Sequence, residues 1–189
     1  MTALSAPSKA LMPHPASAGR AVRSIHVTVE RGAAGILTLT YVVQGDLPGI
    51  YLPDPTPPLR TDKLWKRTCF EVFIRPMGSE AYCEFNLAPS TRWAAYGFTA
   101  CRTGMADLTI PAPDITATRQ GETYVLTARL DLSGVASLVD QRTWSLNLTA
   151  VIEDEDGAHA WWALAHPSPN PDFHHPEAFV LNLPAPEGA

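Results

Sequence analysis

Two glutamates in a predicted β-hairpin are the residues of this chain best suited to do chemistry. The hairpin consists of residues 69–74 (CFEVFI) and residues 82–87 (YCEFNL), joined by a short turn. Because successive side chains of a strand point to opposite faces, Glu71 and Glu84 both fall on the polar face. The opposite face of each strand is apolar and is expected to pack in the core.

An antiparallel pairing of these strands can place Glu71 opposite Glu84 and Phe73 opposite Tyr82. Like charges directly across a ladder cost stability, so such a pair requires a cation, a shared proton, a nearby arginine or a polar ligand. Arg129, on the polar face of a later strand, is the expected counter-charge. The alternative is that neighbouring lysines, arginines and water screen the two carboxylates.

Two neighbouring carboxylates could serve in catalysis, in metal binding or in ligand binding. A retaining glycosidase uses two carboxyl groups about 5 Å apart as nucleophile and acid. A calcium site would draw on the oxygen atoms of Glu71, Glu84 and Asn86, and a binding site would use the same groups to accept hydrogen bonds from a ligand. The chain has no Gly-rich phosphate loop, nucleophile elbow or His-Glu helix motif. We therefore expect a protein that is not an enzyme, with no cofactor or metal in the first interpretation.

Short alternating strands position these groups, and no amphipathic helix of three or more turns is evident. Further runs with strand character are residues 24–30, 36–43, 93–98, 121–130, 144–152, 158–165 and 179–183. Together with 18 prolines, they predict an all-β fold, a two-sheet antiparallel β-sandwich. We expect one domain over residues 24–184, preceded by a disordered leader (1–23) and followed by a short tail (185–189).

Composition makes several classes of partner unfavourable. A net charge of -5 without a basic run disfavours nucleic acid and anionic membrane surfaces. The three cysteines, Cys69, Cys83 and Cys101, have the spacing of neither a disulfide framework nor a zinc site. Residues 1–23 lack the apolar core of a secretory signal, and no run approaches the roughly 18 apolar residues of a membrane span. A cytoplasmic location is therefore expected.

Four segments carry a resemblance to a known family: residues 65–74, 82–89, 93–96 and 171–179. They resemble DOMON-like proteins related to the family 9 carbohydrate-binding modules and, more narrowly, the murB-like subgroup of that superfamily. The likeness runs over about residues 24–184. It implies a β-sandwich that binds a ligand without transforming it, the ligand being a sugar in some members and haem in others.

For a sugar ligand, the resemblance implies aromatic side chains that stack on the pyranose ring and polar groups that bond its hydroxyls. The stacking candidates here are Trp65, Trp161 and Trp162. The polar candidates are Glu71, Glu84, Asn86 and Arg129. Each tryptophan has the alternative of packing in the core, where large aromatic side chains mostly lie. The expected ligand is a carbohydrate or a related small polar molecule, such as an intracellular saccharide or nucleotide-sugar.

For haem, the resemblance implies axial ligation by one Met and one His or Lys from loops at one end of the sandwich. Met105 with His166, His174 or His175 could supply that pair here. His174 and His175 could instead fix a terminal loop by hydrogen bonds. The sequence thus predicts a non-catalytic binding domain, with carbohydrate as the first ligand, haem as the alternative and a protein partner as a further alternative.

Overall fold

The computed structural model describes residues 7–139 and 143–186, which form twelve β-strands and four 3-10 turns. All the strand pairings along the sheet are antiparallel. The all-β antiparallel class predicted from the sequence is therefore confirmed. Among the described residues, no helix is long and apolar enough to cross a bilayer.

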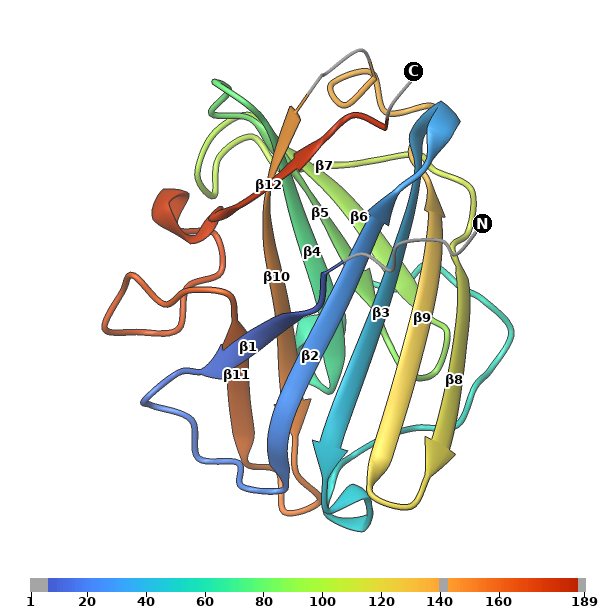
Figure 1. The fold of residues 1–189 in the computed structure, drawn as a ribbon, viewed down its shortest axis with the longest axis vertical. Helices are drawn as coiled ribbons and strands as arrows, with labels where there is room; N and C mark the ends of the chain where they lie inside the picture. The colour runs from blue at the N-terminus through green and yellow to red at the C-terminus, as the bar shows by residue number, and fades with distance from the viewer. Residues whose placement is uncertain (1–6, 140–142, 187–189) are drawn as a thin grey trace.

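Four long strands form one half of the sheet, which lies in front in Figure 1. In spatial order they are β2 (Val22–Arg31), β3 (Ile36–Gly45), β9 (Thr123–Asp131) and β8 (Asp114–Gln120). Their inward side chains alternate with outward ones along each strand, as the period-two pattern of the sequence predicts.

The other half lies behind it (Figure 1) and carries the predicted hairpin. Its strands are β7 (Ala106–Asp107), β6 (Trp93–Phe98), β5 (Tyr82–Leu87), β4 (Cys69–Pro76), β10 (Thr143–Glu153) and β11 (His159–Ala163), in that order, with β12 (Leu181–Pro184) also paired to β10. Nearly every residue of β4, β5 and β10 is buried, so this half is covered on both of its faces.

The two halves face each other across one hydrophobic core. Phe70 and Phe85 of the rear half and Leu126 of the front half are fully buried in it. Tyr41 of β3 reaches across this core and donates a 2.7 Å hydrogen bond to the carbonyl oxygen of Glu71 on β4. The apolar face predicted for the hairpin is therefore confirmed as a core face.

The first strand joins the two halves. β1 (Lys9–Pro13) pairs with β2 on one side and with β11 on the other. Two of the predictions are corrected by this strand. Hydrogen bonds run continuously through β1 rather than leaving two separate sheets. Part of the predicted disordered leader, residues 1–23, is ordered as β1 and the start of β2, while residues 1–6, like residues 187–189 of the predicted tail, lie outside the described residues.

The hairpin register differs from the predicted one by two residues. Glu71 pairs with Asn86, and Phe73 pairs with Glu84, so the two glutamates are diagonal neighbours on one face. β4 ends at Pro76 and β5 begins at Tyr82, so residues 77–81 connect them, one position later than the predicted turn at Pro76 to Glu80; within the connection, the hydroxyl of Ser79 accepts a hydrogen bond from the backbone N–H of Ala81. A shift of two residues keeps every side chain on its predicted face.

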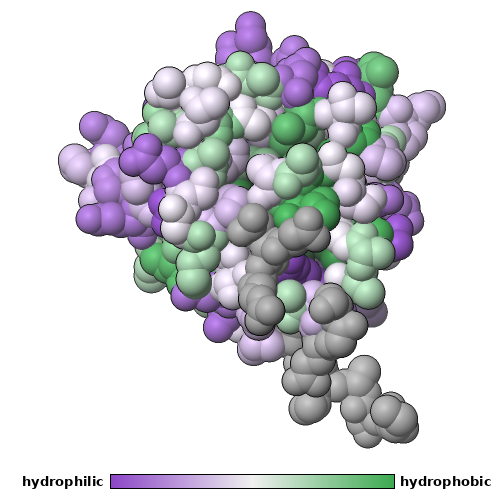
Figure 2. Space-filling model, turned by 90° about the horizontal axis from the view of Figure 1, so that it is seen from above, coloured by the Kyte–Doolittle hydropathy of each residue, from purple (hydrophilic) through white to green (hydrophobic). Residues whose placement is uncertain are grey.

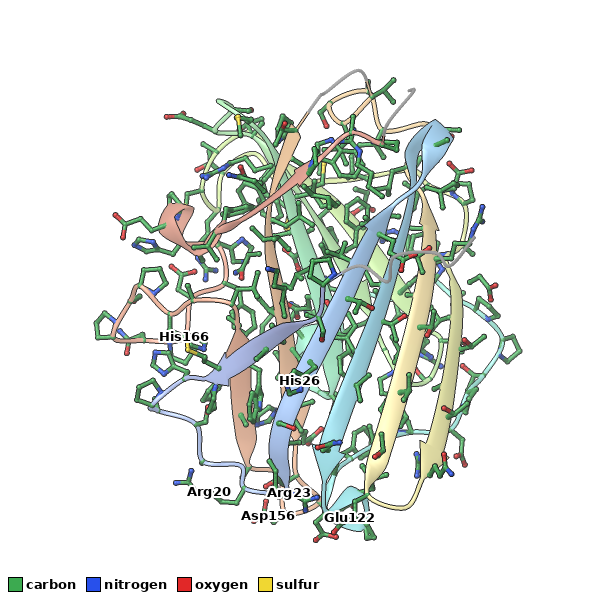
Figure 3. The ribbon with its side chains drawn as sticks, viewed as in Figure 1. Arg20, Arg23, His26, Glu122, Asp156 and His166 are labelled. Atoms are coloured by element: carbon green, nitrogen blue, oxygen red, sulfur yellow. The ribbon has the colours of Figure 1, made fainter. Side chains whose placement is uncertain are left out.

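The two ends of the front half are finished with charged side chains. At one end, Arg23 of β2 forms an exposed 2.7 Å ion pair with Glu122 in the β8–β9 turn, low in Figure 3. At the other end, the guanidinium carbon of Arg31 lies 3.5 Å from the ring centre of Trp144, which is buried. From above, hydrophilic residues lie mainly around the outline and apolar residues show among them (Figure 2).

Because β1 joins the two halves of the sheet and packs one face on the core, substitutions at two neighbouring positions of β1 should change the stability unequally. Leu11 is 4% exposed and packs in the core, whereas the next side chain, Met12, is 52% exposed. Leu11→Ala should lower the free energy of unfolding by about 2–4 kcal/mol, and Met12→Ala should change it by less than about 0.5 kcal/mol. Urea unfolding of both variants checks this, and equal effects would contradict the packing of β1 against the core.

Candidate functional site

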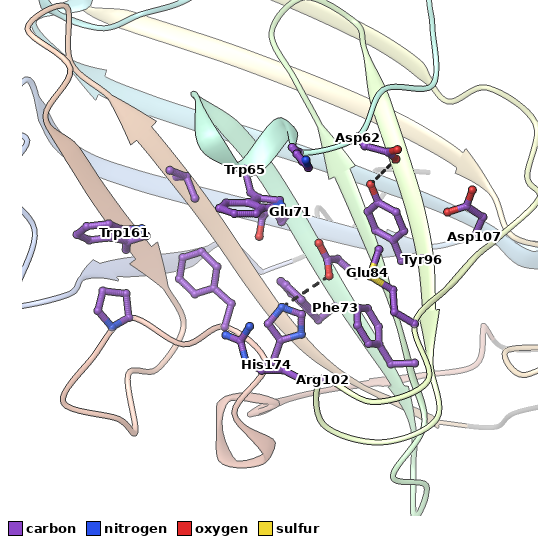
Figure 4. A pocket seen from close by; sticks show the side chains of 16 residues that line it. Asp62, Trp65, Glu71, Phe73, Glu84, Tyr96, Arg102, Asp107, Trp161 and His174 are labelled. Atoms are coloured by element: carbon purple, nitrogen blue, oxygen red, sulfur yellow. Dashed lines mark hydrogen bonds and ion pairs between the residues drawn. The ribbon is translucent and has the colours of Figure 1, made fainter.

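A cavity of about 600 Å³ lies on the face of the rear half that is turned away from the core. Figure 4 shows the side chains that line it. Its floor is formed by alternate residues of neighbouring strands, namely Glu71 and Phe73 of β4, Glu84 of β5, Tyr96 of β6 and Val151 of β10. The predicted polar face of the hairpin is thus the floor of a pocket rather than a solvated surface.

Both glutamates of the floor are buried, Glu71 to 2% exposure and Glu84 to 5%. One oxygen of Glu71, Oε2, accepts a 3.3 Å hydrogen bond from the hydroxyl of Thr149 on β10. Its other oxygen, Oε1, is buried and has no hydrogen-bond partner. Glu84 Oε1 accepts a 2.7 Å hydrogen bond from the side-chain amide of Asn86. In the ionised form of Glu71, Oε1 is therefore an acceptor that no described residue uses.

Burial makes ionisation of this pair unfavourable. It raises the pKa of Glu71 well above the ordinary value, and the negative charge of Glu84 raises it further. Burial also raises the pKa of Glu84, although the hydrogen bond from Asn86 and the charge of Arg102 act in the opposite direction. The two carboxyl groups consequently hold protons at a pH where an exposed glutamate would have lost its own.

His174 closes the pocket beside Glu84 as a neutral group. Burial is the main cause that lowers its pKa to about 4, and the positive charge of Arg102 adds to the effect. The hydroxyl of Tyr82 accepts a hydrogen bond from the backbone N–H of Arg102 and forms a second hydrogen bond, 2.7 Å long, with His174 Nδ1. The Nε2 atom of His174 faces Glu84 Oε2 at 3.8 Å.

The walls of the pocket are aromatic. Trp65 is half exposed and lies on a 3-10 turn (Leu64–Lys66), which begins after Lys63 turns the chain with a φ of 62°. Trp161 lines the pocket from β11. Phe73 packs edge-on against His174, with ring centres 5.1 Å apart. These rings offer apolar faces to a ligand that stands over the carboxyl groups.

The rim carries charges that are already paired. Arg60 contacts Asp62 at 3.1 Å and Asp107 at 2.7 Å. Asp62 also accepts a 2.8 Å hydrogen bond from the hydroxyl of Tyr96, which is the main cause that lowers the pKa of this carboxyl. Arg102 forms a 2.8 Å ion pair with Asp172.

The segment that covers one side of the pocket is held by polar contacts from the sheet. The side-chain amide of Asn147, a buried residue of β10, donates a 3.0 Å hydrogen bond to the carbonyl oxygen of Phe173. The backbone N–H of His174 donates to Asp172 at 3.0 Å. Phe173 and His174 are thereby fixed over the floor, as the loop-fixing interpretation of His174 predicts.

The structure brings four predicted sugar-site residues together around one cavity: Trp65, Glu71, Glu84 and Trp161. Asn86 lies behind them, fully buried, where it donates to Glu84 and pairs with Glu71 across the ladder. It supports the floor rather than lining the cavity.

Two predicted site residues lie elsewhere. Arg129 belongs to β9 in the front half, where it pairs with Asp114 and is exposed, so it is not the counter-charge of the glutamates. Trp162 follows Trp161 on β11 and therefore points to the opposite face, where it is 5% exposed in the core. Trp162 therefore packs in the core, which was the alternative to a sugar-stacking role.

The candidate haem ligands are placed as follows in the structure. Met105 and His174 both line the pocket, and Met105 is 58% exposed. His174 Nδ1 is hydrogen-bonded to the hydroxyl of Tyr82, and its Nε2 lies 3.8 Å from Glu84 Oε2. For calcium, no group of three or more His, Cys, Asp or Glu side chains among residues 7–139 and 143–186 is placed to hold a metal ion.

Several residues of the pocket were not predicted. Tyr96 follows from the alternation of the strand 93–98, whose outward face carries it beside the hairpin. Asp62, Lys63 and Arg102 come from irregular segments, and no periodic pattern in the sequence indicates where such side chains point.

Comparison with known proteins identifies the class of fold. Searches with the sequence find no matching protein family and no matching curated protein. The structure is similar to a protein from Bacteroides uniformis ATCC 8492 to which carbohydrate binding has been provisionally assigned, with a TM-score of 0.71 and 14% identity over 96% of this chain and 87% of the other.

It is also similar to a family 9 carbohydrate-binding module from Caldicellulosiruptor kristjanssonii, solved in complex with glucose, with a TM-score of 0.56 and 9% identity over 94% of this chain and 84% of that one. At these identities the likeness establishes a shared all-β fold.

The raised pKa of Glu71 predicts a particular dependence of stability on pH. Above the ordinary pKa of 4.5, the folded protein retains a proton that the unfolded chain has lost, so this carboxyl makes stability fall as pH rises. In Glu71→Gln that loss is absent. The free energy of unfolding of the variant, relative to wild type, should therefore rise with pH between 4.5 and the raised pKa of Glu71 in the folded protein. The rise should be at most about 1.4 kcal/mol per pH unit.

Urea unfolding at a series of pH values measures this difference. His174, with a pKa lowered to about 4, makes stability rise with pH up to its ordinary 6.5, but it does so in both proteins and cancels in the comparison. Glu30→Gln, at an exposed position on β2, serves as the control. Parallel curves for wild type and Glu71→Gln would contradict the burial of an uncharged Glu71.

Proposed function

We propose that this protein is a non-catalytic carbohydrate-binding module and that the cavity over Glu71 and Glu84 receives the sugar. The observation that carries the proposal is the unused acceptor Glu71 Oε1, buried at the floor of an aromatic-walled cavity. A buried acceptor without a partner costs free energy, and a ligand hydroxyl that donates to it removes that cost.

The two surfaces of a sugar ring match the two surfaces of this cavity. A pyranose has apolar C–H faces, which can lie against the indole rings of Trp65 and Trp161, and a hydroxyl-bearing edge, which can reach the carboxyl groups. A volume of about 600 Å³ falls within the range of small-molecule sites, about 300–1,000 Å³. The fold shared with a glucose-bound family 9 module supports the same ligand class.

The electrostatics favour binding over catalysis. A retaining glycosidase needs one ionised carboxylate as its nucleophile. Here burial raises the pKa of both Glu71 and Glu84, and the nearest basic side chain, His174, is neutral at pH 7 because its pKa is lowered to about 4. Among the described residues, neither carboxyl group forms an ion pair with a lysine or an arginine, and the charge of Arg102 only partly opposes the effect of burial on Glu84.

We also propose the finer assignments made from the sequence: kinship with the murB-like subgroup of DOMON-like proteins and a cytoplasmic location. The free thiols of Cys69, Cys83 and Cys101, none of them paired in a disulfide, are in keeping with a reducing compartment. The fold shared with a family 9 module supports the kinship.

Removal of one aromatic wall should weaken sugar binding without weakening the fold. Trp65→Ala is expected to reduce affinity for glucose by about tenfold or more, because truncation of an aromatic anchor at a binding site costs about 2 kcal/mol. The side chain is 50% exposed, so the free energy of unfolding should change little. Isothermal titration calorimetry and urea unfolding give the two values.

Met77→Ala is the matched control, since Met77 is similarly exposed and lies outside the cavity. If the two variants bind glucose as well as wild type, the cavity beside Trp65 is not the sugar site.

A further inference from the structure

Among the described residues, neither buried carboxyl group forms an ion pair with a lysine or an arginine. Of the two permanently charged bases that line the cavity, Arg102 is ion-paired with Asp172 and Lys63 is exposed at the rim. The acidic rim residues Asp62 and Asp107 are satisfied by Arg60. Neither Arg102 nor Lys63 is within ion-pair distance of Glu71 or Glu84, although the charge of Arg102 acts on Glu84 by lowering its pKa.

We infer that the preferred ligand of this cavity is an amino sugar with a free amino group, whose ammonium donates to the unused Glu71 Oε1 and to Glu84. The inference rests on the proposed carbohydrate-binding function and specifies the class of sugar. A neutral sugar can offer a hydroxyl to Glu71 but leaves the pair without a counter-charge. An ammonium satisfies the buried acceptor and balances the carboxylates at once, through hydrogen bonds that are stronger because both partners are charged.

The surroundings of the pair fit an organic cation. Phe73, Tyr96 and Trp65 present aromatic rings to the cavity, and the face of such a ring attracts an ammonium group within about 6 Å. A bare metal ion would need more oxygen donors than two carboxyl groups supply. Within the part of the chain that the structure describes, no group of three or more His, Cys, Asp or Glu side chains is placed to hold a metal ion.

Binding of an ammonium should also expel protons from the pair. The titratable and charged groups around the two carboxyl groups are Tyr41, Cys69, Tyr82, Tyr96, Arg102 and His174. Burial and the negative charge of Glu84 raise the pKa of Glu71 well above its ordinary value, so the displaced proton is expected to come from Glu71. The ligand keeps its three ammonium protons, and the proton leaving the pair passes to the buffer.

Calorimetric titration with three sugars tests the inference. The probes are glucosamine, glucose and N-acetylglucosamine, which share one ring and differ in the 2-substituent, at pH about 6.5, where an amine of this kind is protonated. Glucosamine should bind about tenfold tighter than either neutral sugar, equivalent to about 1.4 kcal/mol. Titration in two buffers of different ionisation enthalpy should reveal proton release with glucosamine and none with glucose.

Two variants locate the effect. In Glu71→Gln the preference for glucosamine should fall to about unity while glucose still binds, because the amide keeps the shape of the side chain and loses its charge. Glu84→Gln should also reduce the preference, and it serves where Glu71→Gln fails to fold. Glu30→Gln, exposed on β2, should keep the full preference.

The outcomes separate this inference from the proposed function. Equal affinities for glucosamine and glucose in wild type would overturn the amino-sugar preference and leave carbohydrate binding intact. A preference that survives in both Glu71→Gln and Glu84→Gln would overturn the role of the carboxyl pair. The absence of binding by all three sugars, in a protein shown to be folded, would overturn the proposed function and this inference together.

Discussion

The burial of two carboxyl groups side by side, without a cation, is the constraint on which the site depends. Neither Glu71 nor Glu84 stabilises the fold as a charged group, because removal of a carboxylate from water costs more than the nearby hydrogen bonds return. Burial raises the pKa of both groups, which favours their protonated forms, and the side chains of Asn86 and Thr149 donate hydrogen bonds to them. Glu71 Oε1 is left without a hydrogen-bond partner among the described residues, and a ligand in the cavity can supply one.

The architecture makes this arrangement possible because β4 and β5 are covered on both faces. One face packs against the front half of the curled sheet, through Phe70 and Phe85. The other face lies under the segment that carries Phe173 and His174, which Asn147 holds in place. The apolar contacts of the core offset the cost of the second, polar face, so a binding site can be built there from strands that do not move.

Local pattern predicts the faces of these strands but not their surroundings. The alternation of residues 69–74 and 82–87 correctly assigns Phe70 to the core and both glutamates to the other face. It cannot give the register, since a shift of two residues preserves every face, and it cannot say whether a polar face meets water or a covering loop. The burial of the glutamates follows from contacts with residues about ninety positions away, such as the pairing of Tyr82 with His174.

The same limit explains the two misplaced residues. Trp161 and Trp162 must point to opposite faces of their strand, and the sequence contains this fact, but which of them faces the core depends on how β11 pairs with β10 and β1. Arg129 lies on a polar face, as predicted, yet β9 belongs to the front half, whose outer face is remote from the hairpin. Membership of one half or the other is set by strand pairing over the whole chain, and no local pattern encodes it.

The most direct test of this account is the titration of the glutamate side-chain carboxyl carbons by NMR, with and without saturating glucosamine. The account predicts that in the free protein the Glu71 resonance titrates well above the ordinary pKa of 4.5 and the Glu84 resonance above it, and that the bound ligand shifts both titrations to lower pH. Titration of both carbons near 4.5, unchanged by the ligand, would contradict it.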